Sequence, residues 1–457
     1  MQKLAVLACP FLFTFLPAQT DDARLQAGFE RWQEAWGTFT KAMTEARTAG
    51  LVRKGGELPE AVRELQTKAE AERTALVTEF DARDDLAAGS YRTLARLHET
   101  GRDYRAAVRA YERCLAKGDA EHPDLTTMGT LCIAAMNSKD DELAAKWMRT
   151  LIAHEDQLGR GPRNLSVRTS YYPRTLIALG DWDGLDALVG KLGADETPAC
   201  RSAAATFGVV GYMQRGDVTA AGERVAAILA QPDGFPDHQA WAVLVQLALD
   251  VHAGEFERGA QQVRTFLAAP ARADGSAQDK NQRRYLAAIA PFLGKPAPQL
   301  RVDHWVGADD AAASDDALSR LRGKTVVLDF WQPWCEPCRK AMPKLVALQA
   351  KHAEDLAVIG PCKIEDYGYD VSERAAVRPI AAADYPAHVV DFHTDMQLNY
   401  PLAIAATGAN STAYGVTGIP TLVVIDRQGV VRYMSCGAGE PGLIELAVAG
   451  VLAHGAR

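Results

Sequence analysis

The stretch Thr325-Val-Val-Leu-Asp-Phe-Trp-Gln-Pro-Trp-Cys335-Glu-Pro-Cys338-Arg339 decides the fold of the C-terminal part of the chain. Its apolar start, Thr325–Trp331, predicts a buried strand, and the residues from Cys335 to His352 have the spacing of a helix. The two cysteines therefore stand at a strand-to-helix turn, where the helix N-terminus stabilises a thiolate. This arrangement suits reversible disulfide chemistry.

Three residues of this stretch are expected to carry the chemistry. Cys335 is the expected attacking thiol, because it opens the helix and is the more accessible of the two cysteines. Cys338 can then resolve a mixed disulfide by attacking the sulfur of Cys335. Asp329 is costly to bury in an apolar strand, so we predict a raised pKa and a role as the base for Cys338. Alternatively, Asp329 faces water on an edge strand.

The residues between and beside the cysteines shape the site. Glu336 allows two interpretations: it raises the pKa of Cys335 and shuttles a proton, or it is a solvated glutamate that favours the helix N-terminus. Pro337 fits the first helical turn, where its missing N–H costs little. Trp334 and Pro337 are expected to line the substrate-binding surface, with Trp331 as a further wall.

A second motif, Gly418-Ile-Pro420-Thr, opens another apolar strand. A proline at this point is a candidate for a cis peptide bond. Such a turn beside the thiols leaves the backbone of Ile419 free to bind an extended substrate chain. Ile419 and Pro420 are therefore predicted to contact substrate.

The remaining C-terminal pattern alternates strands and helices, which predicts an α/β layered sheet. The further strands expected are Leu356–Pro361, Thr421–Asp426 and Val430–Met434, and Leu300–Val306 is expected to form a first strand or a hairpin. The further helices expected are a segment around Val371–Ala382 and Leu443–Ala453.

The preceding part of the chain, residues 21–290, is predicted to be helical, since β-branched runs are scarce in it. From about residue 90, a stripe of one small or apolar residue followed by two larger ones recurs every 36 to 41 residues. Its lead positions are Ala107, Ala144, Leu185, Ala221 and Gly259. That period indicates stacked helical hairpins. The segments resemble tetratricopeptide repeats; the alternative is an irregular helical bundle.

Length and composition limit the possible functions. A chain of 457 residues with 48% apolar residues should form two or more compact units. The net charge of −8 gives no sign of a nucleic-acid partner. Of eight cysteines, one lies near the N-terminus and two form the motif. The other five match no zinc-site spacing, so most are expected to be buried apolar side chains, and neither a metal nor a cofactor is expected.

The first residues are typical of an export signal. Lys3 precedes the apolar run Leu4–Leu16, which is too short to span a bilayer, and Leu16-Pro-Ala18 fits a cleavage site. We therefore predict a signal peptide at residues 1–18 and export to an oxidising compartment, the periplasm. The alternatives are a buried apolar helix and a lipoprotein anchor at Cys9.

The C-terminal part resembles the thioredoxin superfamily through the Asp329 to Arg339 motif, Pro343 and Gly418-Ile-Pro420-Thr. The lead-in Gly294-Lys-Pro-Ala-Pro298 and Arg322-Gly-Lys324 are similar to the exported TlpA, ResA and DsbE-like branch. This resemblance implies Cys335 as nucleophile, Cys338 as resolving thiol, Asp329 as buried proton acceptor and Pro420 as the cis-proline. The expected domains are N-terminal helices at 19–90, tetratricopeptide-like repeats at 91–290 and a thioredoxin-like domain at 291–457.

The function expected from these features is thiol–disulfide exchange with protein clients in an exported, reductive enzyme. Its partners would be client thiols or disulfides, a membrane or periplasmic electron donor and a protein bound to the helical repeats. The alternative is a helical-repeat interaction scaffold with a redox-sensing thioredoxin-like domain. A thiol peroxidase is a third reading, but Cys335 follows Trp331-Gln-Pro-Trp334 where peroxiredoxins have a Pro-x-x-x-Thr lead.

Overall fold

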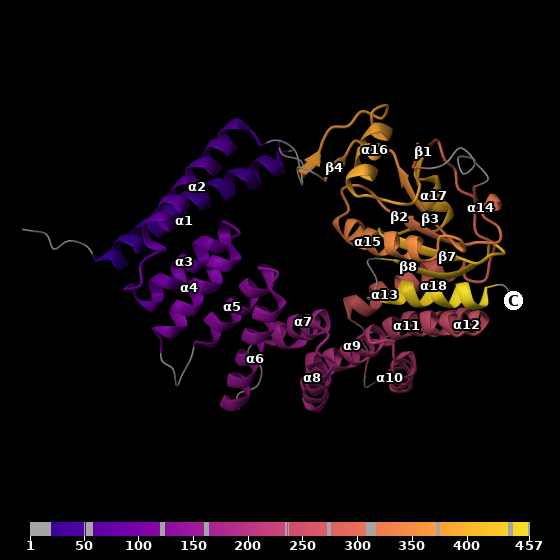
Figure 1. Cartoon of the computed structure of the whole chain (residues 1–457), viewed down its shortest axis with the longest axis horizontal. Helices are drawn as coiled ribbons and strands as arrows, with labels where there is room; N and C mark the ends of the chain where they lie inside the picture. Colours follow the sequence, from indigo (N-terminus) through magenta and orange to yellow (C-terminus); the bar gives the residue numbers. More distant parts are fainter. Residues whose placement is uncertain are drawn as a thin grey trace, which may run out of the picture. The chain divides into compact units, whose positions relative to one another are not determined.

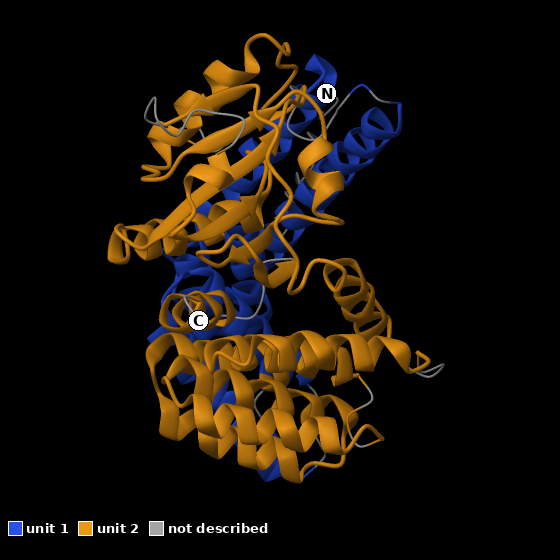
Figure 2. Ribbon diagram, turned by 90° about the vertical axis from the view of Figure 1, so that its right-hand side faces the viewer, with its two compact units in different colours: residues 1–52, 58–167 blue, residues 53–57, 168–457 orange. Residues whose placement is uncertain are grey.

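The chain forms two compact units (Figure 2): residues 1–52 with 58–167, and residues 53–57 with 168–457. The structure, a computed structural model, describes residues 20–49, 51, 58–118, 124–159, 164–233, 235, 237–271, 276–307, 317–371, 375–436 and 442–455. The predicted signal peptide at residues 1–18 lies outside the described residues. Within the described residues, none of the helices has the length and apolar character needed to cross a bilayer.

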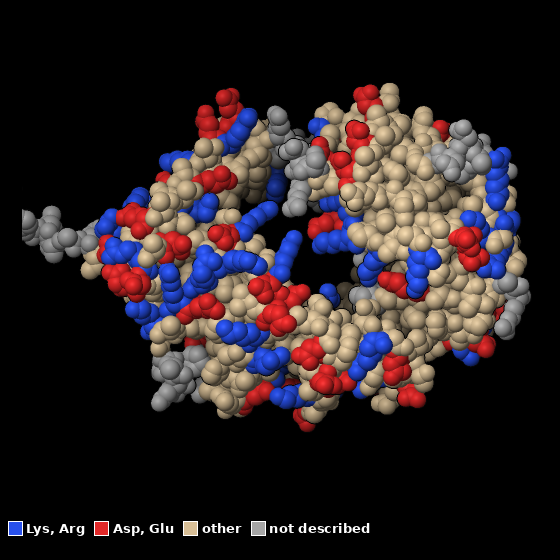
Figure 3. Space-filling model, in the orientation of Figure 1, with Lys and Arg blue, Asp and Glu red and all other residues tan. Residues whose placement is uncertain are grey.

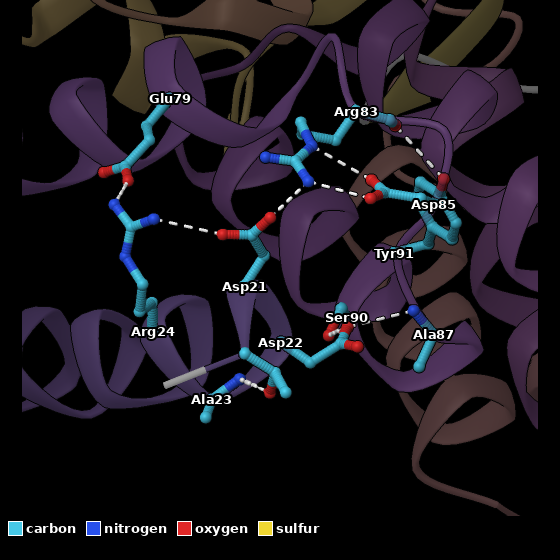
Figure 4. A network of polar contacts seen from close by, with 11 residues as sticks. Asp21, Asp22, Ala23, Arg24, Glu79, Arg83, Asp85, Ala87, Ser90 and Tyr91 are labelled. Atoms are coloured by element: carbon cyan, nitrogen blue, oxygen red, sulfur yellow. Dashed lines mark hydrogen bonds and ion pairs between the residues drawn. The ribbon is translucent and has the colours of Figure 1, made fainter. Parts of the chain in front are cut away.

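The first unit is helical. Its helices are α1 (Asp21–Thr48), α2 (Glu60–Phe80), α3 (Ala88–Thr100), α4 (Tyr104–Ala116), α5 (Leu125–Asn137) and α6 (Asp141–Leu158). The start of α1 is held to the segment before α3 by a polar network (Figure 4). Asp21 pairs with Arg24 at 3.0 Å and with Arg83, while Asp22 accepts hydrogen bonds from the Ala87 N–H at 2.9 Å and the Ser90 hydroxyl at 2.5 Å.

The second unit combines helices with a sheet (Figure 1). A π-helical turn, η1 (Val167–Tyr171), leads into its helical part. The helices there are α7 (Tyr172–Leu179), α8 (Trp182–Ala194), α9 (Pro198–Gln214), α10 (Val218–Ala230), α11 (Gln239–His252), α12 (Phe256–Ala268) and α13 (Ala277–Ile289).

The predicted stripe falls on every second helix from α4 to α12, and each of its lead residues is buried. The helices α3 and α4, α5 and α6, and so on to α11 and α12 pack against each other as consecutive pairs. An aspartate caps the second helix of four pairs, since the side chains of Asp103, Asp140, Asp181 and Asp217 accept a backbone N–H of the first turn. The helical hairpins are thus present, and their tetratricopeptide-like character stays a prediction.

The sheet of the second unit has six strands in the order β1-β6-β3-β2-β7-β8. These are β1 (His304–Val306), β2 (Thr325–Phe330), β3 (Leu356–Lys363), β6 (Leu402–Ala405), β7 (Thr421–Ile425) and β8 (Val431–Cys436). The pairs β2–β3 and β3–β6 are parallel, and the other pairs are antiparallel. The mixed sheet confirms the predicted α/β fold of this region, with β2 at its centre.

Helices cover the sheet and place the cysteine motif. Among them are α14 (Ala317–Arg320), α15 (Glu336–Lys351), α16 (Tyr385–Asp395), α17 (Ala409–Ala413) and α18 (Leu443–His454). Helix α15 packs against β3, and α18 packs against β2, β7 and β8. Strand β2 ends at Phe330 and α15 begins at Glu336. The short loop between them therefore places Cys335 just beyond the C-terminal end of the central strand β2.

The prediction of a helix around Val371–Ala382 is wrong. This region forms a small antiparallel hairpin of β4 (Gly368–Asp370) and β5 (Ala375–Val377), and the helix α16 begins only at Tyr385. Pro379 lies inside the predicted helix and cannot donate the N–H that a helix interior needs, whereas Pro386 fits the first turn of α16. The first strand is also shorter than predicted, and β6 and α17 were not predicted.

Acidic and basic side chains are interspersed on the face shown in Figure 3. A nucleic-acid-binding surface typically gathers Lys and Arg into a patch or stripe of one sign. The mixed surface on this face differs from that arrangement.

Candidate active site

The two motif cysteines form a disulfide at the start of α15. Cys335 is the N-cap of the helix, and its sulfur accepts a hydrogen bond from the Cys338 N–H at 3.3 Å. Cys335 is 4% exposed and Cys338 is fully buried. Cys335 is therefore the more accessible of the two cysteines, and its role as the attacking thiol stays a prediction.

Asp329 lies on the central strand β2 between β3 and β7, where it is opposite Leu422. It is fully buried, and neither of its carboxylate oxygens has a hydrogen-bond partner among the described residues. Burial raises the pKa of Asp329 to about 7. The structure thus excludes the alternative in which Asp329 faces water on an edge strand, and the role of Asp329 as the base for Cys338 stays a prediction.

A buried tyrosine is close enough to Asp329 to interact with its charge. Burial, and to a lesser extent the Asp329 carboxylate, raises the pKa of Tyr400. The Tyr400 hydroxyl likewise has no hydrogen-bond partner among the described residues. This part of the interior therefore holds two unsatisfied polar side chains.

The second motif forms a turn before β7. The Ile419–Pro420 peptide bond is cis, as predicted. The carbonyl of Gly418 accepts hydrogen bonds from the Thr421 hydroxyl at 2.7 Å and from the Cys436 thiol at 3.6 Å. These contacts hold the residue before Ile419 in place at the end of the sheet.

A groove of about 260 Å³ lies between this turn and the loop before Cys335. Its lining includes Trp334, Glu365, Val416 and Ile419, together with the buried Cys362. The structure thus brings Trp334 and Ile419, both predicted from the sequence, to one groove. Pro337 is exposed in the first turn of α15 and is not part of its lining.

Comparison with known proteins agrees with this geometry. Residues 293–450 match the family model described as Redoxin. The chain is 31% identical over 121 residues to the thioredoxin-like protein YneN of Bacillus subtilis, covering 26% of this chain and 61% of that protein. It is 30% identical over 139 residues to the thiol-disulfide oxidoreductase ResA of Bacillus thuringiensis, covering 30% of this chain and 66% of ResA.

The C-terminal region is thus similar to thioredoxin superfamily proteins of the TlpA and ResA type. The chain spans less than two thirds of the length of these relatives. It is also similar to the solution structure of a thioredoxin-like protein in the oxidised form, with 21% identity, a TM-score of 0.28, and coverage of 35% of this chain and 95% of that one.

Glu336 lies on the surface of the thioredoxin-like domain. Its side chain is 67% exposed and pairs with Lys340 one turn along α15 at 2.8 Å. The neighbouring Arg339 donates to the Pro333 carbonyl at 2.5 Å and lies over the Tyr369 ring at 3.6 Å. This placement fits a glutamate that favours the helix N-terminus, and a role in proton transfer stays a prediction.

Three residues of the site were missed from the sequence. Gln332 is buried; its amide accepts from the Tyr385 hydroxyl at 2.7 Å and donates to the Lys363 carbonyl at 3.2 Å. Glu365 accepts a hydrogen bond from the Trp334 indole, and Tyr367 stacks on that indole. For Glu365 and Tyr367, the sequence signal was a polar and an aromatic residue directly after β3. They come close to the motif loop because the end of β3 lies beside that loop.

Five further cysteines lie in the part of the chain that the structure describes. Four of the five remaining cysteines are buried and unpaired (Cys114, Cys132, Cys200 and Cys362), and Cys436 is partly exposed. Burial raises the pKa of the Cys362 thiol, which therefore stays protonated. Across the described ranges, no cluster of three or more His, Cys, Asp or Glu residues is placed to hold a metal ion.

Proposed function

We propose that the protein is an exported thiol–disulfide oxidoreductase that exchanges disulfides with protein clients through Cys335 and Cys338. The observation that carries this proposal is the disulfide at the N-terminus of α15, in which Cys335 is the outer sulfur. The buried carboxyl group of Asp329 and the cis-proline turn support it. The name of the relative ResA, a thiol-disulfide oxidoreductase, points the same way.

In the reductive direction the dithiol form acts first. The Cys335 thiolate attacks one sulfur of a client disulfide, so a Cys335–client disulfide forms and the other client sulfur leaves as a thiolate. Cys338 then loses its proton to the Asp329 carboxylate and attacks the Cys335 sulfur. The second client sulfur leaves, and two electrons have passed from the protein dithiol to the client.

Binding of the client is assigned to the groove and the cis-proline turn. An extended client segment would pair with the free backbone of Ile419 beside Pro420 and contact Trp334 and Pro337. The Glu336 carboxylate, at the exposed start of α15, is proposed to exchange protons with the departing thiolate.

The partners follow from the same reaction. A reductive enzyme needs an electron donor that returns Cys335 and Cys338 to the dithiol state, and an exported protein would receive electrons from a membrane or periplasmic carrier. The helical pairs α3 to α12 are proposed as a surface for a protein partner.

An insulin-reduction assay with dithiothreitol tests the proposal. The protein should accelerate precipitation of reduced insulin, and Cys335→Ser should fall to the rate of dithiothreitol alone. Cys338→Ser should instead accumulate a covalent Cys335–client adduct, because the resolving thiol is missing. The matched control is Cys200→Ala, a buried cysteine of α9, which should keep the wild-type rate. Full activity in Cys335→Ser would exclude the proposal.

The reduction potential of the Cys335–Cys338 couple tests the direction. A value near that of thioredoxin, about −270 mV, would support a reductant, and one near about −120 mV would support an oxidant. Equilibration with glutathione buffers followed by alkylation measures it.

A further inference from the structure

The indole of Trp334, directly before Cys335, is held by two side chains that follow β3. Its Nε1–H donates to Glu365 Oε2 at 2.6 Å. Its ring stacks on Tyr367 with 5.9 Å between the ring centroids and 19° between the planes. One contact fixes the edge of the indole and the other fixes a face, so together they define its orientation.

Glu365 and Tyr367, which contact the indole, each contact a further side chain. The other carboxylate oxygen of Glu365 pairs with Lys363 Nζ at 3.0 Å, and the Glu365 side chain is only 21% exposed. A hydrogen bond to an ionised acceptor is roughly twice as strong as a neutral one. The guanidinium of Arg378 lies over the Tyr367 ring, 4.4 Å from its centroid.

Trp334 and Glu365 line the groove together with Val416 and Ile419, so the indole forms part of its wall. The groove volume of about 260 Å³ is below the range of about 300–1,000 Å³ that is usual for small-molecule sites. A single large side chain fits a space of this size. If the indole turned away, this wall would be lost although the two motif sulfurs would be unchanged.

We propose that Glu365 is a positioning residue that fixes the Trp334 indole, and that the resulting groove selects clients with a large apolar side chain next to their cysteine. This inference rests on the proposed function. Glu365 acts through Trp334 and is assigned no contact with the reacting sulfurs. Its removal should therefore weaken client binding more than it slows the chemical step.

The test compares three disulfide substrates with the full chain: a peptide with Phe beside its cysteine, the same peptide with Ser there, and 5,5′-dithiobis(2-nitrobenzoate). Glu365→Leu should raise KM for the Phe peptide about 5-fold, as expected for loss of one charge-assisted hydrogen bond at a partly exposed site. The kcat for that peptide and the rates with the other two substrates should stay near wild type. Glu365→Gln keeps an acceptor oxygen and should restore most of the affinity.

Two variants separate positioning from general effects. Glu354→Leu changes an exposed glutamate just before the other end of β3 and serves as the matched control. Trp334→Phe removes the indole N–H, so adding Glu365→Leu to it should cost little more than either change alone. Additive effects, an unchanged KM for the Phe peptide, or an equal loss on all three substrates would overturn the inference.

A binding measurement keeps this test separate from the proposed function. An analogue of the Phe peptide with Ser in place of its cysteine cannot exchange disulfides, so calorimetry on the oxidised protein reports the groove alone. Its Kd should rise about 5-fold in Glu365→Leu and much less in Glu365→Gln. Equal Kd values in wild type and Glu365→Leu would contradict the inference whether or not the protein reduces disulfides.

Discussion

Asp329 has an environment that few carboxylates tolerate. It lies on the central strand, fully buried, without a hydrogen-bond partner in the part of the chain that the structure describes. Burial disfavours the charged form, and the pKa rises from 3.8 to about 7. A carboxyl group with this pKa exchanges its proton near neutral pH, as the proposed role of Asp329 as the base for Cys338 requires.

Asp329→Asn should remove a pH dependence from both stability and activity. The folded-state pKa of Asp329 lies above its unfolded-state value. The contribution of Asp329 to the free energy of unfolding is therefore greatest below about pH 4 and is lost as the pH rises to about 7. The shift corresponds to at most about 4 kcal/mol. Relative to wild type, Asp329→Asn should gain stability over this window in urea titrations, and the ionisation near pH 7 should disappear from the rate of client release.

The matched control is Asp395→Asn, which changes an exposed aspartate at the end of α16. It should leave both pH profiles as in the wild type. A stability difference between Asp329→Asn and wild type that is the same at pH 4 and pH 8 would show that Asp329 is not the titrating group.

At this scale the sequence predicted the residues whose roles depend on local spacing. Cys335, Cys338 and Asp329 lie within ten positions of one another, and Pro420 opens its own strand. Glu365 and Gln332 were missed because their partners are distant in sequence. The Trp334–Glu365 contact spans 31 residues and the Gln332–Tyr385 contact spans 53, and no periodic pattern connects them.

The element scale is governed by the turns between paired helices. Before α8, α10 and α12 the turn contains a glycine with positive φ, at Gly180, Gly216 and Gly254. In the first two of these turns the next residue is an aspartate that caps the following helix. In these two turns the glycine, with its left-handed backbone, reverses the chain, and the aspartate caps the next helix. Two adjacent residues therefore define each of the two turns.

Two glycine substitutions near α10 should have opposite effects. Gly216 has φ 82°, and a Cβ there meets no atom within 4 Å, so Gly216→Ala should cost about 1 kcal/mol through backbone strain alone. Gly222 lies inside α10 with the same open space, so Gly222→Ala should add about 0.5–1 kcal/mol through helix propensity. Chemical denaturation monitored by circular dichroism measures both, and shifts of the same sign would contradict this account of the turn.

Sequence patterns predicted the long elements better than the short ones. The helical stripe and the strands β2, β3 and β7 have enough residues for a period to appear. The hairpin of β4 and β5 has three residues in each strand, and β6 has four, Leu402–Ala405, with no alternation. Tertiary pairing with β3 and β1 gives β6 its conformation, and that information is not local.

Within the second unit, the helical pairs and the thioredoxin-like domain share a packed interface. Helix α11 lies against α18 and β8, and His252 Nδ1 lies 3.2 Å from the Leu446 carbonyl. Arg432 on β8 pairs with Glu257 on α12 at 3.7 Å. The predicted boundary near residue 291 stays a prediction, but contacts cross it throughout this unit. The Pro- and Gly-rich sequence there marked a change of fold and carried no information about packing.

The backbone of α18 lies close to that of α11 at Gly450, and Gly450→Ala should loosen this interface. A Cβ at Gly450 would lie 2.2 Å from the Val251 carbonyl oxygen, a backbone atom that cannot move without shifting α11. Overpacking costs about 1–3 kcal/mol, and the gain in helix propensity offsets up to about 1 kcal/mol of it. The net loss should appear as faster amide hydrogen exchange in both α11 and α18.

Ala449→Ser, on the exposed side of the same helix, should leave exchange unchanged. Faster exchange confined to α18 would show that α11 does not depend on this contact.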